Sequence, residues 1–105
     1  MNAALGPSGH VDTFSRDNLP PADQWPELLL DGFDYPEHLN AAVELTDRMV
    51  DQGFGDHTAL IGNGRRRTYK ELTDWTNRLA HALVDDYGVR PGNRVLIRSA
   101  NNPAM

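Results

Sequence analysis

The fold of this 105-residue chain is decided by the stretch Gly62-Asn63-Gly64-Arg65-Arg66-Arg67-Thr68-Tyr69-Lys70-Glu71. Its Asn-Gly pair tolerates the positive φ angles of a tight hairpin turn. The apolar run Thr58–Ile61 before the turn fits one strand, and Arg66–Tyr69 can return as the other. Thr68 and Glu71 have the T-x-x-E spacing of a helix capping box. The stretch therefore predicts a β-hairpin that leads directly into a helix.

A helix is expected on each side of this hairpin. The first has apolar residues at helical spacing from Leu39 to Val50, with Asn40 and the D-x-x-E pair of Asp34 and Glu37 as rival starts. Gly53 and Gly55 are expected to end it. The second and longest helix closes at Gly88. Its apolar face consists of Leu72, Trp75, Leu79, Ala82 and Leu83.

Beyond the long helix, the sequence predicts a turn, a strand and a new helix. Pro91-Gly92 is a turn, and Arg94–Arg98 has the nearly continuous apolar centre of a buried strand in an α/β sheet. Asn102-Pro103 has the pattern of an N-cap followed by proline at the first helical position. Because the chain stops at Met105, within that first turn, we expect it to be a fragment of a longer protein.

The predicted fold class is α/β, with an order of extended arm, helix, β-hairpin, helix and strand. Residues 1–38 hold one Arg against seven Asp and Glu, together with five of the seven prolines, which favours an extended acidic arm. Residues 39–105 are expected to form a partial N-terminal α/β subdomain. One apolar cluster is predicted from Leu60, Trp75, Leu79, Leu83, Val95 and Ile97. The arm is expected to lie over this body through Phe14, Leu19, Trp25, Leu28, Leu29, Leu30 and Phe33.

Composition excludes several classes of protein. With 10 Lys and Arg against 15 Asp and Glu, the formal charge is −5, which does not favour a general nucleic-acid binder. The chain has no Cys and therefore no disulfide scaffold, thiolate metal site or Cys nucleophile. No apolar run approaches the roughly 18 residues of a membrane helix, and no signal peptide is evident. The expected compartment is the cytoplasm.

Residue types that carry chemistry form no complete constellation. The histidines are His10, His38, His57 and His81, and none has a close metal-binding spacing. Asp56-His57 and Asp85-Asp86 could be acid–base or carboxylate pairs, although exposed polar positions explain both. No nucleophile elbow surrounds Ser8, Ser15 or Ser99. Trp25 and Trp75 are interpreted as packing residues.

Two interpretations compete for the glycine and arginine run 62–67. It could bind an anion or nucleic acid, but it lacks the P-loop and dinucleotide-binding spacings. The favoured interpretation is a hairpin turn followed by an edge strand, whose arginines discourage pairing with other chains.

An ordered set of phrases resembles the N-terminal region of adenylate-forming enzymes, which include acyl-CoA and aryl-CoA ligases. These phrases are Gly64–Leu72, Asn77–Ala80, Gly88–Val95 and Asn101–Pro103, with Asn93 where the family commonly has Asp. In the arm, Asp12–Phe14, Asp17–Pro21 and Gln24–Pro26 resemble the start of benzoate-type and 2-aminobenzoate-type CoA ligases. The resemblance implies a parent enzyme that converts an acid to acyl-AMP with ATP and magnesium, and then transfers the acyl group to coenzyme A.

The resemblance assigns no catalytic, cofactor-binding or metal-binding residue to this chain, because neither the phosphate loop of the family nor the lysine of its C-terminal lid domain occurs in this sequence. The fragment is expected to be an inactive scaffold without a cofactor, whose partner is the remainder of the ligase chain. A small carboxylic acid is the parent's expected substrate, neither nucleic acid nor membrane is expected as a partner, and the fragment alone is expected to self-associate. The alternatives are a free-standing interaction module and an adenylation domain that loads a carrier protein.

Overall fold

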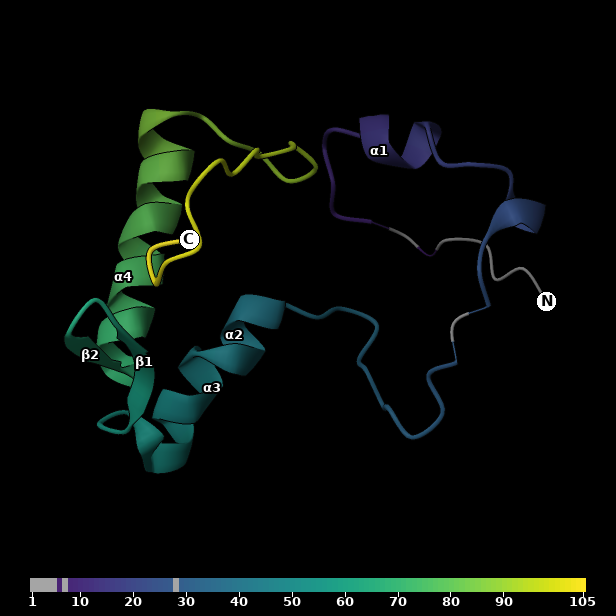
Figure 1. Ribbon diagram of the computed structural model, residues 1–105. Helices are drawn as coiled ribbons and strands as arrows, with labels where there is room; N and C mark the ends of the chain where they lie inside the picture. Colours follow the sequence, from purple (N-terminus) through teal and green to yellow (C-terminus); the bar gives the residue numbers. More distant parts are fainter. Residues whose placement is uncertain (1–5, 7, 28) are drawn as a thin grey trace.

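The computed structural model describes residues 6, 8–27 and 29–105 (Figure 1). Its regular elements follow the order α1, η1, α2, α3, η2, β1, β2, α4 and η3. In Figure 1, the hairpin of β1 and β2 lies against the lower part of α4, and α3 lies beside the same helix, with α2 packed on α3. The described part is thus a small mixed piece of helices and one two-stranded sheet. Within this part, no helix has the length and apolar character needed to cross a membrane.

The predicted hairpin is confirmed. The strands β1 (Thr58–Gly62) and β2 (Arg65–Thr68) pair in antiparallel orientation. Asn63 has a φ of 52° and Gly64 a φ of 71°. Positive φ at both central residues matches the twist of the flanking strands, which explains why an Asn-Gly pair occupies this turn.

The capping box at the start of the long helix is also confirmed. Thr68 Oγ1 accepts a hydrogen bond from the Glu71 amide at 3.2 Å, and Glu71 Oε2 accepts one from the Thr68 amide at 2.8 Å. These two bonds satisfy amides that a helix start leaves without partners. The helix α4 (Tyr69–His81) continues into the π-helical segment η3 (Ala82–Asp86). Gly88, with a φ of 65°, ends it as predicted.

The helix before the hairpin is interrupted, whereas the sequence predicted one continuous helix. Asn40 is its N-cap, since its side chain accepts hydrogen bonds from two backbone amides of α2 (Ala41–Leu45). Thr46 then departs from helical geometry, with φ −124° and ψ −68°, before α3 (Asp47–Met49). The Thr46 hydroxyl bonds the Ala42 carbonyl at 2.7 Å. Such bonds back to the preceding turn bend helices.

A π-helical segment, η2 (Val50–Phe54), links this region to the hairpin. Within it, Gly53 adopts a φ of 88° and ends the helical path, as its position predicted. The first two amides of α4 then donate to the carbonyls of His57 and Gly55 at 3.0 and 2.9 Å. These bonds attach the start of α4 to the loop after η2.

The arm predicted at residues 1–38 is helical in two short segments. It contains the short helices α1 (Phe14–Asp17) and η1 (Ala22–Gln24). Local side-chain bonds start α1, because Asp12 Oδ1 accepts from the Phe14 amide at 3.0 Å and Thr13 Oγ1 donates to Asp17 Oδ2 at 2.7 Å.

The apolar residues of the arm do not anchor it as predicted. Trp25 is half-buried and donates its indole N–H to the Pro20 carbonyl at 2.8 Å. The exposed members of the set are Phe14, Leu19, Leu29, Leu30 and Phe33, and Leu28 lies outside the described residues. Polar contacts near Asp12, rather than apolar packing, join the arm to the rest of the chain.

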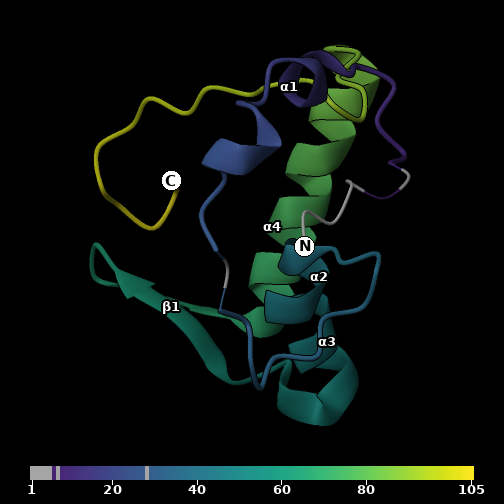
Figure 2. The same cartoon turned by 90° about the vertical axis from the view of Figure 1, so that its right-hand side faces the viewer.

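The predicted strand Arg94–Arg98 is absent from the structure. Among the residues that the structure describes, β1 and β2 pair only with each other, which leaves this segment without a neighbouring strand there. Figure 2 shows it as part of the yellow-green loop that runs from the end of α4 back toward the C-terminus. Leu96 is 92% exposed. At Asn102 the chain forms a turn rather than a helix, with its Oδ1 accepting from the Ala104 amide at 2.8 Å.

The predicted apolar cluster does not form a core. Leu79, Val95 and Ile97 are exposed, and Leu60, Trp75 and Leu83 are only half-buried. Among the described residues, no apolar side chain is fully buried. The radius of gyration is 17.3 Å, against about 13 Å for a compact domain of this length. The described chain therefore leaves its apolar faces without cover.

Candidate functional site

The histidines and carboxylates singled out from the sequence do not converge. The ring of His57 lies edge-on to Phe54, with 5.2 Å between ring centroids. His81 Nδ1 lies 3.3 Å from Asp85 Oδ2 on the exposed face beyond α4. His10 and His38 are both exposed. Across residues 6, 8–27 and 29–105, no three His, Asp or Glu side chains gather as metal ligands would.

The other candidates serve local structure. The Ser8 hydroxyl accepts from the His10 amide at 3.1 Å, and the Ser99 hydroxyl donates to the Ala100 carbonyl at 3.0 Å. Ser15 lies within α1 and is exposed, and so are Asp56 and Asp86.

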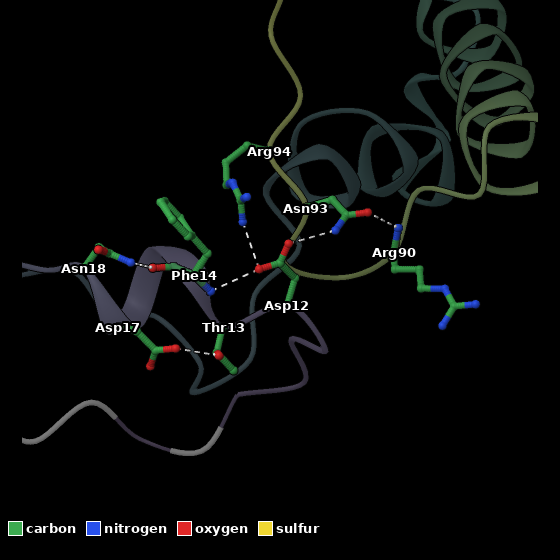
Figure 3. A network of polar contacts seen from close by, with 8 residues as sticks. All are labelled: Asp12, Thr13, Phe14, Asp17, Asn18, Arg90, Asn93 and Arg94. Atoms are coloured by element: carbon green, nitrogen blue, oxygen red, sulfur yellow. Dashed lines mark hydrogen bonds and ion pairs between the residues drawn. The ribbon is translucent and has the colours of Figure 1, made fainter.

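A polar network around Asp12 connects the arm to the turn after the long helix (Figure 3). The Asp12 carboxylate accepts from Arg94 Nη1 at 2.8 Å and from Asn93 Nδ2 at 3.0 Å, in addition to the Phe14 amide. The Phe14 amide and then the Arg94 guanidinium lower the pKa of Asp12 below its ordinary value. Arg94 also lies 4.4 Å from the centroid of the Phe14 ring. The carboxylate is therefore held ionised.

Backbone contacts reinforce this network. The amides of Val11 and Asp12 both donate to the Pro91 carbonyl, at 2.9 and 3.2 Å. Gly92 has a φ of 95°, and a Cβ at that position would lie 2.1 Å from the Asp12 carbonyl oxygen. Only glycine satisfies both constraints without strain. The Pro91-Gly92 turn, which the sequence predicted, thus also forms the docking point of the arm.

The network uses Asn93 at the position where the resembled family commonly has Asp. Its side-chain amide donates to Asp12, while its Oδ1 accepts from the Arg90 amide at 2.9 Å. A carboxylate there would repel Asp12 instead of donating to it. Both segments that meet here resemble the family in sequence, but 81 positions separate Asp12 from Asn93, and no local pattern predicts a contact over that distance.

A second candidate site is a pocket of about 390 Å³ beside the hairpin. It includes the candidate residues Arg65 and Arg67, and the guanidinium of Arg67 lies 4.4 Å from the centroid of the Trp75 ring. The remaining lining residues are Leu60, Gly62, Asn63, Asn102, Pro103 and Ala104. Trp75, interpreted from the sequence as a packing residue, thus packs against an arginine rather than within an apolar cluster.

The candidate sites lie largely within a segment that matches a known family. The family described as AMP-binding enzyme matches residues 47–105, which is more than half of the chain. This segment contains the hairpin, α4 and the whole pocket, together with the Pro91–Arg94 turn that receives the arm. No solved structure shows a significant match to the chain.

Curated relatives include aryl-CoA ligases and acetyl-CoA synthetases. The 3-hydroxybenzoate–CoA/4-hydroxybenzoate–CoA ligase of Thauera aromatica is 39% identical over 69 residues, which cover 66% of this chain and 13% of that protein. The benzoate–CoA ligase of Thauera aromatica is 39% identical over 62 residues, with 59% and 12% covered. The acetyl-coenzyme A synthetase of Streptomyces avermitilis is 39% identical over 64 residues, with 56% and 10% covered. The chain spans between 10% and 13% of the length of these three relatives. The family match confirms the resemblance seen in the sequence, and the chain belongs to the AMP-binding enzyme family.

Proposed function

We propose that this chain is the N-terminal scaffold of an AMP-forming acid–CoA ligase. The observation that carries the proposal is the family match over residues 47–105, joined by relatives whose names describe CoA ligases and synthetases. In the proposed reaction, a carboxylate attacks the α-phosphorus of ATP and releases pyrophosphate. The sulfur of coenzyme A then attacks the acyl carbonyl of the acyl-AMP, forms the thioester and releases AMP.

We further propose an aromatic acid, such as benzoate or 2-aminobenzoate, as the substrate. Relatives named for benzoate and hydroxybenzoate support this choice, as do the arm phrases that resemble aryl-CoA ligases. Relatives named acetyl-coenzyme A synthetase have similar identity over this segment, so acetate is the necessary competitor in any test. Because ATP and coenzyme A are intracellular substrates, the proposed compartment is the cytoplasm.

The role proposed for the 105 residues is structural rather than catalytic. Acyl-AMP formation requires cations and amide donors held around a triphosphate. The described residues bring no three carboxylate or imidazole side chains together. Their arginine-rich turn joins two strands instead of leading from a glycine-rich loop into a helix. The groups that would hold ATP, magnesium and coenzyme A are therefore proposed to lie in the rest of the ligase.

The rest of the ligase is also the proposed partner of the exposed apolar segments. The side chains of Val95, Leu96 and Ile97 are between 56% and 92% exposed. An apolar run of this kind is typical of a strand covered on both faces. In the ligase we expect neighbouring strands and helices to cover it, and in the isolated chain we expect self-association through the same residues.

Pyrophosphate exchange tests the proposal. The 105-residue chain and the ligase that contains it would each be incubated with ATP, magnesium, labelled pyrophosphate and one acid from a panel of aromatic, acetic and fatty acids. Exchange by the ligase with aromatic acids, and none by the chain, is the expected result. A ligase that accepts only acetate or fatty acids would overturn the aromatic substrate. Exchange by the chain alone would overturn the scaffold role.

A further inference from the structure

The two faces of the hairpin differ in chemistry. The register places Leu60 opposite Arg67 and Gly62 opposite Arg65, and all four residues line the pocket. Successive side chains of a strand point to opposite faces, and Arg66, between the two pocket arginines, is not a lining residue. Two of the three consecutive arginines are thus gathered on one face.

The pocket is completed by α4 and the C-terminal segment. Trp75 comes from α4, and Asn102, Pro103 and Ala104 lie across the hairpin face. A Cβ on Gly62 would lie 2.2 Å from Pro103 Cγ, so the missing side chain is what allows Pro103 to approach. The volume of about 390 Å³ is within the range of small-molecule sites.

Arg67 is positioned by its stacking on Trp75. The guanidinium lies 4.4 Å from the centroid of the indole, in the range of a cation–π contact. Stacking of this kind holds the plane of the guanidinium and leaves its N–H groups available at the edge. A planar fork of donors is suited to two oxygens of one anion.

The polar groups of the pocket are suited to an anion. No carboxylate lines it, and neither Arg65 nor Arg67 takes part in an ion pair with the described residues. Asn102 Oδ1 already accepts from the Ala104 amide at 2.8 Å, which leaves its Nδ2 as the group able to bind a ligand. Two guanidinium groups and an amide donor therefore border the same space.

We propose that this pocket binds the phosphate group of a small phosphate monoester. The two negative charges of such a group match the two arginines, and its tetrahedral oxygens can accept from donors on different elements. A carboxylate has one charge and two coplanar oxygens, so one arginine would satisfy it. The proposal goes beyond the ligase assignment and does not depend on it, because binding is measured on this chain without any reaction.

Fluorescence of Trp75 provides the measurement. In a Trp25→Phe background, Trp75 is the one remaining tryptophan and reports on its own pocket. Inorganic phosphate and AMP would be titrated at constant ionic strength, with adenosine and benzoate as the matched compounds that lack a phosphate. Saturable changes in the millimolar range or below are expected for phosphate and AMP, and none for adenosine or benzoate.

Three variants in the same background locate the site. Arg65→Gln and Arg67→Gln should each weaken AMP binding at least tenfold, while Arg66→Gln should change it less than twofold. Circular dichroism would verify that all three keep the helix content of the parent. The proposal is overturned by equal losses in the three variants, by an absent response to phosphate and AMP, or by benzoate or adenosine binding as tightly as AMP.

Discussion

The hairpin with its following helix and the segment Arg94–Arg98 both have the composition of regular structure, yet only the first is regular in this chain. The hairpin and α4 are held by bonds between close neighbours in sequence: a turn at Asn63-Gly64 and a capping box over Thr68–Glu71. The segment 94–98 requires a second strand from elsewhere. Local hydrogen bonds can therefore form an element within this chain, whereas apolar composition alone only identifies a surface that needs a partner.

The largest expected effect concerns Ile97, which is 66% exposed in this chain. If the segment becomes a buried strand in the complete ligase, Ile97→Ala should destabilise the ligase by about 2–5 kcal/mol. In the isolated chain, the same change should alter the free energy of unfolding by less than about 0.5 kcal/mol. Denaturant unfolding of both proteins measures the difference, with Leu29→Ala, a change at an exposed residue of the arm, as the control. Equally small effects in both proteins would mean that the segment is never a core strand.

A smaller effect is expected from Gly92→Ala, which should weaken the contact between the arm and the Pro91-Gly92 turn. The alanine would combine an unfavourable φ of 95° with a clash against the Asp12 carbonyl, at a cost of about 1–3 kcal/mol. Hydrogen exchange at the Val11 and Asp12 amides should accelerate markedly. Gly32→Ala is the matched control, because Gly32 has a φ of 88° with no neighbour near its missing Cβ. Unchanged protection in the Gly92 variant would contradict the described contact.

The local determination of α4 is tested at Thr68, the residue that caps its start. Thr68→Ala removes the acceptor for the Glu71 amide and should cost about 1 kcal/mol of helix stability, whereas Thr68→Ser keeps the acceptor. Circular dichroism would report the loss of helix, and exchange of the Glu71 amide would locate it. A serine variant as unstable as the alanine variant would show that the hydroxyl is not what starts the helix.

The most modest effect is a dependence of arm docking on pH. The pKa of Asp12 is lowered, first by the Phe14 amide within the arm and then by Arg94 across the docking contact, and the part due to Arg94 favours the docked state. This contribution is complete above the ordinary aspartate pKa of about 3.9 and is lost as pH falls through the lowered pKa. Chemical shifts of the Phe14 amide should therefore be constant from about pH 5 to 8 and change only below about pH 4.

The control for this titration is Asp12→Asn, which keeps an acceptor but removes the ionisable group. Its Phe14 amide shift should lose the acidic transition. A transition in the unmodified chain centred above the ordinary aspartate value would contradict the bonds described for this carboxylate.

Sequence reasoning reached those parts of the fold that neighbouring residues determine. The Asn-Gly turn, the Thr68–Glu71 capping box and the Asn40 cap each depend on residues within a few positions of one another. The interruption of the helix at Thr46 was not predicted, because the spacing of apolar residues does not show that the Thr46 hydroxyl donates to the Ala42 carbonyl in the preceding turn. The strand at 94–98 was wrong for this chain because composition cannot supply a pairing partner.

In the candidate sites, too, features that depend on neighbouring residues could be predicted from the sequence, and features that depend on distant residues could not. The three arginines after the turn could be named from sequence, but their separation into a pocket pair and an outward residue depends on the strand register. The sequence around Asp12 indicates no role for its carboxylate. Its role depends on Arg94, 82 positions away, and no periodic pattern connects two loops at that distance.

The 82 positions between Asp12 and Arg94 also determine the order in which parts of the chain are synthesised and can fold. At about 5–20 residues per second, a ribosome needs roughly 4–16 s to advance from Asp12 to Arg94. A β-hairpin forms within microseconds once its strands are available, and helices form faster still. The hairpin and most of α4 are therefore synthesised before Arg94, the residue that binds Asp12. During those seconds the Asp12 carboxylate is already synthesised, but the arginine that binds it is not, so the arm cannot yet make this contact.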